Sequence, residues 1–190
     1  MARSDDLYSL PAGLPVPVDD GAAKHLPHMM VPPIALPSTR GRSVVLADES
    51  QQRRVVVYAY PRTGEPDKDT PPGWDAIPGA RGCTPQSCGF RDIHGEFARL
   101  DAAVFGLSTQ TTEYQREMAE RLHLPFEVLS DSAFRLQRAL KLPTFEVADL
   151  TLLKRLTLVL FQGEVEHVFY PVFPPDQSAR KVLDWLRAKV

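Results

Sequence analysis

Two cysteines stand five residues apart in the stretch Gly82-Cys83-Thr84-Pro85-Gln86-Ser87-Cys88-Gly89-Phe90-Arg91-Asp92. A long polar loop precedes this stretch, and apolar residues at spacings of three and four follow from Phe90 to Leu100. The pattern predicts a helix that begins at or near Cys83. The unpaired N–H groups and the dipole of a helix N-terminus favour an anion, and only the thiolate of a cysteine is nucleophilic. Cys83 is therefore a candidate reactive thiol.

Cys88 lies further along the same predicted helix. Five positions in a regular helix separate two Cα atoms by roughly 8–9 Å, whereas a disulfide requires less than about 7 Å. A bond between Cys83 and Cys88 therefore requires the first turn of this helix to unwind.

The segments around this stretch alternate between strand and helix patterns. Residues 55–60 and 102–108 are continuous apolar runs, which are typical of strands covered on both faces. Weaker strand patterns cover 44–46, 127–129, 152–161 and 165–170. Gln162-Gly163, between the last two of these, is a predicted hairpin turn. Further helical patterns cover 112–122, 132–140 and 176–188. The order predicts an α/β fold of the thioredoxin kind, a mixed central sheet flanked by helices on both faces.

The length of 190 residues suits one domain with a substantial core. Fifteen of the 18 prolines cluster in residues 11–37, 61–78 and 171–175, and such density prevents helices and marks loops or extended arms. We therefore expect a Pro-rich arm over 1–25, a domain over 26–190, and an inserted loop at about 62–82.

The composition is that of a soluble globular protein, with 43% hydrophobic and 24% charged residues. The net charge of −2 provides no basic surface for nucleic acid or for a membrane, and no apolar run is long enough to span a bilayer. No signal peptide is recognisable, so we expect a cytoplasmic, reducing location. Two nearby cysteines in that setting are more often catalytic or metal-binding than structural.

The stretch around the cysteines resembles the Q-type peroxiredoxins, also called bacterioferritin comigratory proteins. Their pattern is a Tyr-Pro at the end of a strand, a loop, and then Gly-Cys-Thr-x-x-x-Cys-x-Phe-Arg-Asp, which appears here as Tyr60-Pro61 and residues 82–92. Similar Leu-Pro-Phe and Leu-Ser-Asp segments stand at 124–126 and 129–131. The resemblance extends over roughly residues 33–186.

The resemblance implies an enzyme, an atypical two-cysteine thiol peroxidase with an antioxidant role and no metal or prosthetic group. Cys83 would be the peroxidatic cysteine, which reduces hydrogen peroxide or an organic hydroperoxide and becomes a sulfenic acid. Cys88 would be the resolving cysteine, forming an intramolecular disulfide that a thioredoxin- or glutaredoxin-like donor reduces. Arg155 would hold the thiolate and polarise the peroxide, and Pro61 would shield the pocket. Such relatives are often monomers.

The sequence departs from this family in the loop before Cys83. The family has Thr three residues before the peroxidatic cysteine and Pro four residues before that Thr, where this chain has Ala80 and Ala76. The missing hydroxyl could come from Thr63 or Thr70, or from neither. Gln86 stands where the family commonly has Glu. The insertion is expected to reshape the mouth of the pocket and to alter the preference for peroxides.

Other interpretations remain open. The altered loop is compatible with a redox sensor or interaction protein that keeps the peroxiredoxin scaffold but has weak or no peroxidase activity. A thiol-disulfide oxidoreductase is disfavoured because the chain lacks Cys-x-x-Cys. A metal site is disfavoured because Cys-x₄-Cys exceeds the usual spacing and no second cysteine pair exists. Two buried, inert thiols are the remaining possibility.

Three further residues have a structural and a functional interpretation. Arg155 could be an exposed charge at a strand end. Arg91 is expected to pair with a carboxylate and support the site. Trp74, within the insertion, either covers the pocket or anchors the loop.

Overall fold

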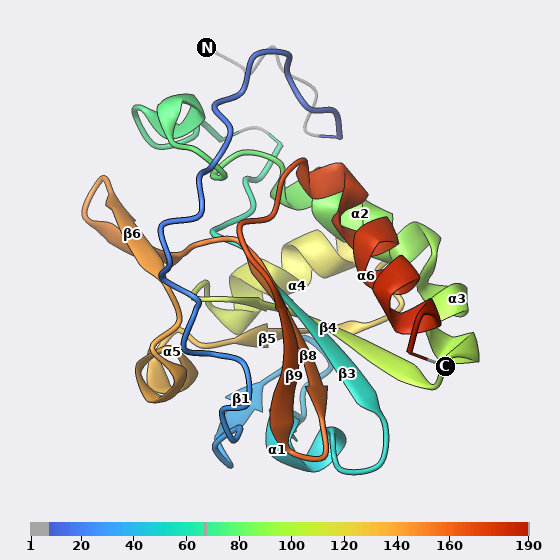
Figure 1. Ribbon diagram of the computed structural model, residues 1–190. Helices are drawn as coiled ribbons and strands as arrows, with labels where there is room; N and C mark the ends of the chain where they lie inside the picture. The colour runs from blue at the N-terminus through green and yellow to red at the C-terminus, as the bar shows by residue number, and fades with distance from the viewer. Residues whose placement is uncertain (1–7, 67, 190) are drawn as a thin grey trace.

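The centre of the molecule is a five-stranded sheet with the strand order β5-β4-β3-β8-β9 (Figure 1). This computed structural model describes residues 8–66 and 68–189. The strands β3 (Arg54–Ala59), β4 (Ala102–Ser108) and β5 (Glu127–Ser130) pair in parallel. β8 (Leu156–Phe161) pairs antiparallel with β3, and β9 (Glu164–Phe169) antiparallel with β8. The sheet is therefore mixed, as predicted.

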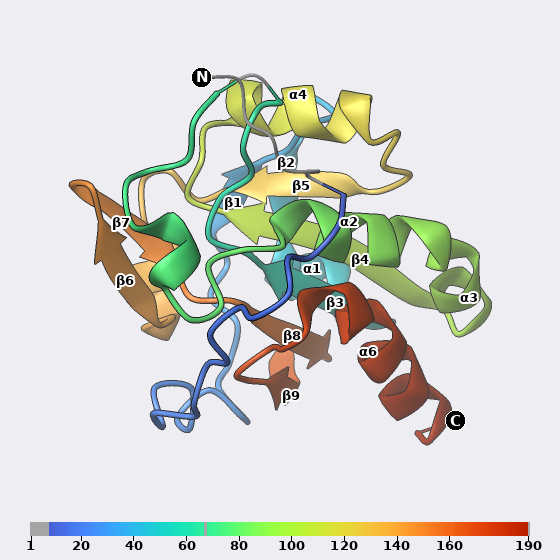
Figure 2. The same cartoon turned by 90° about the horizontal axis from the view of Figure 1, so that it is seen from above.

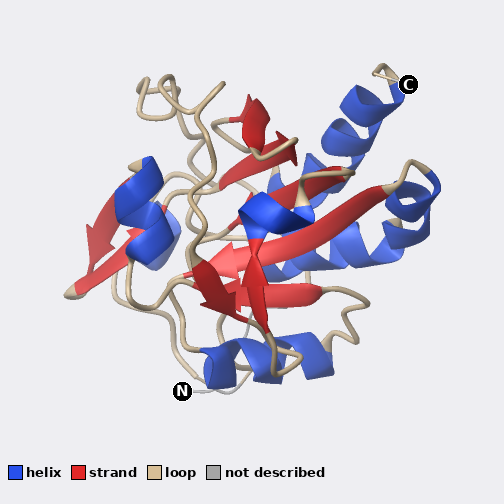
Figure 3. Cartoon of the chain, turned by 90° about the horizontal axis from the view of Figure 1, so that it is seen from below, coloured by secondary structure: helices blue, strands red, loops and turns tan. Residues whose placement is uncertain are grey.

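Helices cover both faces of this sheet (Figures 2 and 3). One face is covered by the helices α2 (Cys83–Asp92), α3 (His94–Arg99), α4 (Thr112–Arg121) and α6 (Ser178–Arg187). The other is covered by α1 (Leu46–Glu49), α5 (Arg135–Leu140) and a small hairpin of β1 (Ala35–Pro37) and β2 (Ser43–Val45). This arrangement confirms the predicted thioredoxin-like α/β class.

The pleat of β3 explains why its sequence is apolar throughout. Val55 and Val57 belong to the core on the α5 side, whereas Val56 and Tyr58 belong to the core on the α2 side. All four side chains are fully buried. Alternate side chains of a strand point to opposite faces, so a central strand between two helical layers needs apolar residues at every position.

Two predicted helices have different limits in the structure. The helical pattern over 84–100 forms α2 and α3, because Ile93 leaves the helical conformation between them at φ −114° and ψ 17°. The helix predicted from residue 132 begins only at Arg135. The buried Asp131 carboxylate accepts the N–H groups of Leu136 at 3.1 Å and Gln137 at 2.7 Å, and so satisfies donors at the start of α5.

The prediction of one strand over 152–161 is wrong. A separate hairpin forms from β6 (Thr144–Val147) and β7 (Leu150–Leu153), and β8 begins only at Leu156. The two residues between β6 and β7 both have positive φ, which is the conformation of a tight hairpin turn. Because β7 pairs with β6 rather than with the central sheet, Lys154 and Arg155 lie in the break before β8.

The described part of the predicted arm, residues 8–25, contains no helix or strand and runs beside the β6–β7 hairpin (Figure 1). Asp20 fixes it to the domain by accepting hydrogen bonds from Lys154 Nζ at 2.5 Å and Tyr170 Oη at 2.7 Å. Residues 1–7 of the arm lie outside the described residues, and the boundary at residue 25 stays a prediction.

The inserted loop contains a short 3₁₀-helix, η1 (Trp74–Ala76). A second 3₁₀-helix, η2 (Pro175–Gln177), precedes α6, so the α-helix begins two residues later than predicted. In residues 8–66 and 68–189, no helix is long and apolar enough to cross a membrane.

Candidate active site

Cys83 is the first residue of α2 and is only 4% exposed. The residue before it must be glycine for two reasons. Gly82 has φ of 101°, which side chains rarely allow, and a Cβ atom there would lie 2.4 Å from Pro175 Cγ and 2.7 Å from Leu10 Cδ2. The close approach of Pro175 and of the arm at Leu10 therefore fixes where the N-terminus of α2, and with it the thiol, can lie.

Arg155 lies against the sulfur. Its Nη2 atom donates a hydrogen bond to Cys83 Sγ at 3.1 Å, and also to the carbonyl oxygens of Ala80 at 3.1 Å and Arg81 at 3.2 Å. Its Nε donates to the carbonyl oxygen of Gly79 at 3.2 Å. Arg155 is 4% exposed. It is therefore a buried cation joining the start of β8 to the loop before α2, and not an exposed charge at a strand end.

Gln86 completes the shell around this guanidinium. Its Oε1 accepts a hydrogen bond from Arg155 Nη1, and its Nε2 donates to Ser178 Oγ at 3.2 Å. Gln86 is fully buried. Within the described residues, no carboxylate forms an ion pair with Arg155. A buried cation is costly without an opposite charge, so a thiolate at Cys83 is its natural counterion.

Replacing Gln86 with Glu is expected to weaken the interaction between Arg155 and the Cys83 thiolate. The new carboxylate would pair with Arg155, so that the guanidinium would no longer depend on the Cys83 thiolate for charge balance. We expect the rate of Cys83 alkylation at pH 7 to fall about tenfold. Mass spectrometry of the modified peptide, in a variant that also carries Cys88→Ser, measures this rate.

The matched control for that variant is Gln86→Met, which has a similar size and no charge. It loses the hydrogen bond to Arg155 but introduces no competing anion, so the rate of Cys83 alkylation should fall less than in Gln86→Glu. Equal rates for Gln86→Glu and Gln86→Met would show that the charge at this position does not matter.

Cys88 lies in the same helix as Cys83 and is half-buried among apolar side chains. Both cysteines are free. Burial raises the pKa of the Cys88 thiol above its ordinary value. In the folded helix Cys88 is therefore kept as the unreactive thiol, and the helix holds it away from Cys83, in agreement with the geometry expected from the sequence.

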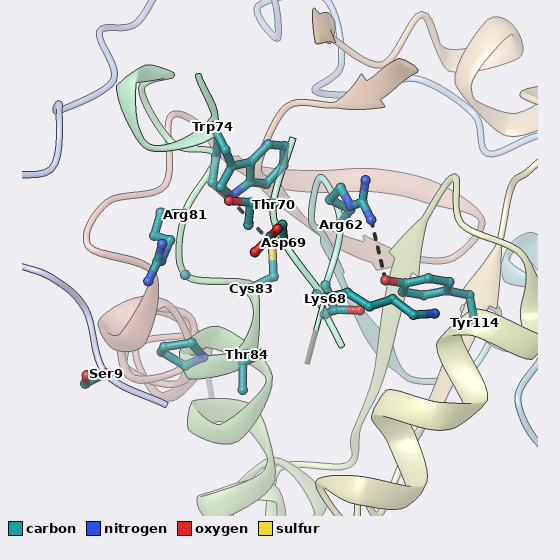
Figure 4. Close-up of a pocket in the computed structure, with 15 residues that line it drawn as sticks. Ser9, Arg62, Lys68, Asp69, Thr70, Trp74, Arg81, Cys83, Thr84 and Tyr114 are labelled. Carbon is teal, nitrogen blue, oxygen red and sulfur yellow. Dashed lines mark hydrogen bonds between the residues drawn. The ribbon is translucent and has the colours of Figure 1, made fainter. Parts of the chain in front are cut away.

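A cavity of about 30 Å³ opens beside Cys83 (Figure 4). Thr63 and Thr70, the two candidates for the missing family hydroxyl, both line it. The Thr63 hydroxyl donates to Gln110 Oε1 at 3.3 Å, so it is already engaged. Ala80 is fully buried, and its carbonyl rather than a side chain faces Arg155.

Pro61, Arg91 and Trp74, the other residues singled out in the sequence, do not contact the Cys83 sulfur in the described hydrogen bonds. Pro61 is buried after the end of β3 but is not among the residues that line this cavity, so its shielding role stays a prediction. Arg91 forms the expected ion pair, with Asp92 at 2.8 Å, and also donates to the Leu122 carbonyl at 3.0 Å. Trp74 both lines the cavity and packs against Phe145, with ring centroids 6.2 Å apart.

Two contacts of the site could not be found from the sequence. Ser178 orients Gln86 from 92 residues away, and no motif links the two positions. Tyr58 Oη donates to Ser87 Oγ at 3.1 Å inside α2, and burial raises the pKa of this phenol, which therefore stays neutral. The only signal for Tyr58 is its place in the strand that leads to the site.

Comparisons of this chain with a family model and with individual known proteins all point to the same family. The model of the Redoxin family matches residues 26–183. The chain is 30% identical over 190 residues to a chloroplastic peroxiredoxin Q of Gentiana triflora, covering 96% of this chain and 78% of that protein. It is 30% identical over 159 residues to peroxiredoxin Bcp of Bacillus subtilis, covering 84% and 83%. The chain belongs to the peroxiredoxin Q/Bcp family.

The fold of this peroxiredoxin agrees with that assignment. The crystal structure of peroxidoxin BcpB from Mycobacterium tuberculosis superposes with a TM-score of 0.69 at 27% identity, covering 86% of this chain and 97% of that one. Membership of the family makes the protein a thiol-dependent peroxidase. It implies a hydroperoxide substrate and a thioredoxin-type reductant, and it confirms the resemblance inferred from residues 82–92.

Proposed function

We propose that this peroxiredoxin reduces hydroperoxides through a sulfenic acid at Cys83 and an intramolecular disulfide with Cys88. The observation that carries the proposal is the 3.1 Å contact between Arg155 Nη2 and Cys83 Sγ at the N-terminus of α2. A buried guanidinium and a helix N-terminus both stabilise a thiolate, which is the nucleophilic form.

In the first step the thiolate attacks one oxygen of the O–O bond. An S–O bond forms, the O–O bond breaks, and Cys83 is oxidised to the sulfenic acid while the peroxide is reduced. The leaving hydroxide or alkoxide takes up a proton and departs as water or alcohol. Arg155 can stabilise the charge that moves from sulfur to oxygen, because its Nη2 donor already points at the reacting sulfur.

In the second step the Cys88 thiol condenses with the sulfenic acid, and water leaves as the S–S bond forms. Both cysteines belong to α2, whose regular geometry keeps them too far apart to bond. The first turns of α2 must therefore unwind after oxidation. A thioredoxin- or glutaredoxin-like dithiol then supplies two electrons and two protons, the disulfide is reduced, and α2 re-forms.

Mass spectrometry of the peroxide-treated protein tests this outline. We expect one equivalent of hydrogen peroxide to remove two hydrogens, and a non-reducing peptide map to link Cys83 with Cys88. Amide exchange of residues 84–88 should accelerate in the oxidised form, because unwound backbone loses its hydrogen bonds. A disulfide between two copies of the chain, or a stable sulfenic acid with Cys88 free, would contradict the proposed resolution.

A further inference from the structure

The cavity beside Cys83 is built mostly by the insertion. Ten of the fifteen described residues that line it belong to residues 62–82 (Figure 4). Its volume is about 30 Å³, and a water-sized group needs about 10–15 Å³ measured in this way. The enclosed space next to the sulfur therefore has room for about two oxygen-sized atoms, which is the size of hydrogen peroxide itself, before the cavity opens to solvent.

The wall of this cavity is held rigidly at Trp74. The indole is 4% exposed and packs with Ala80 and with side chains of the β6–β7 hairpin, including Phe145. The backbone around it folds in successive turns, with hydrogen bonds from Trp74 N to Pro71 O and from Ile77 N to Trp74 O. A wall packed in this way cannot move aside for a large substituent without losing buried contacts.

The lining also contains polar groups that a bulky apolar substituent would cover. It includes the charged side chains of Arg62, Lys68 and Asp69 and the hydroxyl-bearing side chains of Thr70 and Tyr114. An alkyl or aryl substituent covering these groups would remove them from water without replacing their hydrogen bonds. A small polar peroxide has no such penalty.

A second, larger cavity of about 360 Å³ does not offer an alternative place for a substituent. It is lined by apolar side chains such as Val18, Phe145 and Val172, and by Arg155. Cys83 is not among the residues that line it. Because Arg155 contacts the sulfur through its guanidinium and the same residue also borders this cavity, a peroxide with its O–O bond at Cys83 could not extend its substituent there without displacing Arg155.

We propose that the insertion makes this peroxiredoxin selective for hydrogen peroxide over bulky organic hydroperoxides, with Trp74 as a specificity-determining residue. This inference rests on the proposed role of Cys83. The reaction is then the attack of the Cys83 thiolate on HO–OH. It forms the sulfenic acid and a hydroxide ion, which is protonated to water.

Quenched-flow oxidation with alkylation and mass detection tests the selectivity without relying on tryptophan fluorescence. The second-order rate constants for hydrogen peroxide, tert-butyl hydroperoxide and cumene hydroperoxide are each divided by the rate constant of the same peroxide with a free thiol. We expect this normalised value to fall with peroxide size, by at least about tenfold from hydrogen peroxide to cumene hydroperoxide.

Trp74→Ala should open the wall of the cavity. The ratio of the normalised rate constant for hydrogen peroxide to that for cumene hydroperoxide should then fall by about tenfold. Trp74→Leu, which keeps an apolar side chain for the packing against Phe145, gives an intermediate ratio and serves if the alanine variant is unstable. Trp185→Ala is the matched control, since Trp185 stacks on His167 and lines neither cavity. Its ratio should equal that of the unchanged protein.

The outcomes separate this inference from the proposed function. Equal normalised rates for hydrogen peroxide and cumene hydroperoxide, both far above the free thiol, would overturn the selectivity and leave the peroxidase role intact. A ratio that stays the same in both Trp74 variants would overturn the role of Trp74. Rates no faster than a free thiol for every peroxide would overturn the proposed role of Cys83.

Discussion

Cys83→Ser is expected to abolish thiol-dependent peroxide reduction, leaving less than about a thousandth of the turnover. A serine hydroxyl is a far weaker nucleophile than a thiolate at neutral pH, and Arg155 would face a neutral oxygen at the position of the sulfur. The measurement is steady-state peroxide consumption with a thioredoxin, its reductase and NADPH. Retained turnover would show that another residue attacks the peroxide.

Cys88→Ser is the matched control, because it removes the other cysteine from the same helix. The first oxidation should proceed at nearly the original rate, whereas turnover with the dithiol donor should fall strongly. The sulfenic acid at Cys83 should then accumulate and react with dimedone. If both variants lost the first oxidation equally, the two cysteines would not have distinct roles.

The fold could be predicted from the sequence because its central strands are continuous apolar runs between helical patterns. The hairpin of β6 and β7 has no such signal, because Ala148 and Asp149 form its turn with positive φ although neither is the Gly or Asn that marks a two-residue hairpin turn. In the sequence, only Lys154 and Arg155 separate the apolar run of β7 from that of β8. Sequence patterns do not show which partner a strand chooses, and here β7 pairs with β6.

The site was predictable as far as local patterns and the family resemblance extend. The start of α2 places Cys83, and the motif and the strand pattern indicate Cys88 and Arg155. The shape of the cavity was not predictable, because it depends on how residues 62–82 and the arm fold over α2. The contact of Gln86 with Ser178 likewise depends on the packing of α6 against α2, which no local pattern specifies.

Arg155→Met is expected to slow the oxidation of Cys83 by hydrogen peroxide by about 10²–10³-fold. Methionine keeps much of the buried volume but removes the charge and the donor that lies 3.1 Å from Cys83 Sγ. It also leaves the carbonyl oxygens of Gly79, Ala80 and Arg81 without these donors. Each buried unsatisfied carbonyl costs about 1–3 kcal/mol, so the free energy of unfolding should fall as well.

Arg54→Met separates these two effects. Arg54 donates two hydrogen bonds to Glu166, at 2.8 and 2.9 Å, and its replacement removes a partly buried guanidinium that does not contact Cys83. Stability should fall in both variants, but the oxidation rate should fall only in Arg155→Met. Arg155→Lys retains the charge without the planar set of donors, so its rate should lie between those of Arg155→Met and the unchanged protein. An Arg155→Met variant oxidised as fast as the unchanged protein would show that the thiolate is stabilised by the helix N-terminus alone, and that Arg155 serves only to hold the loop before α2.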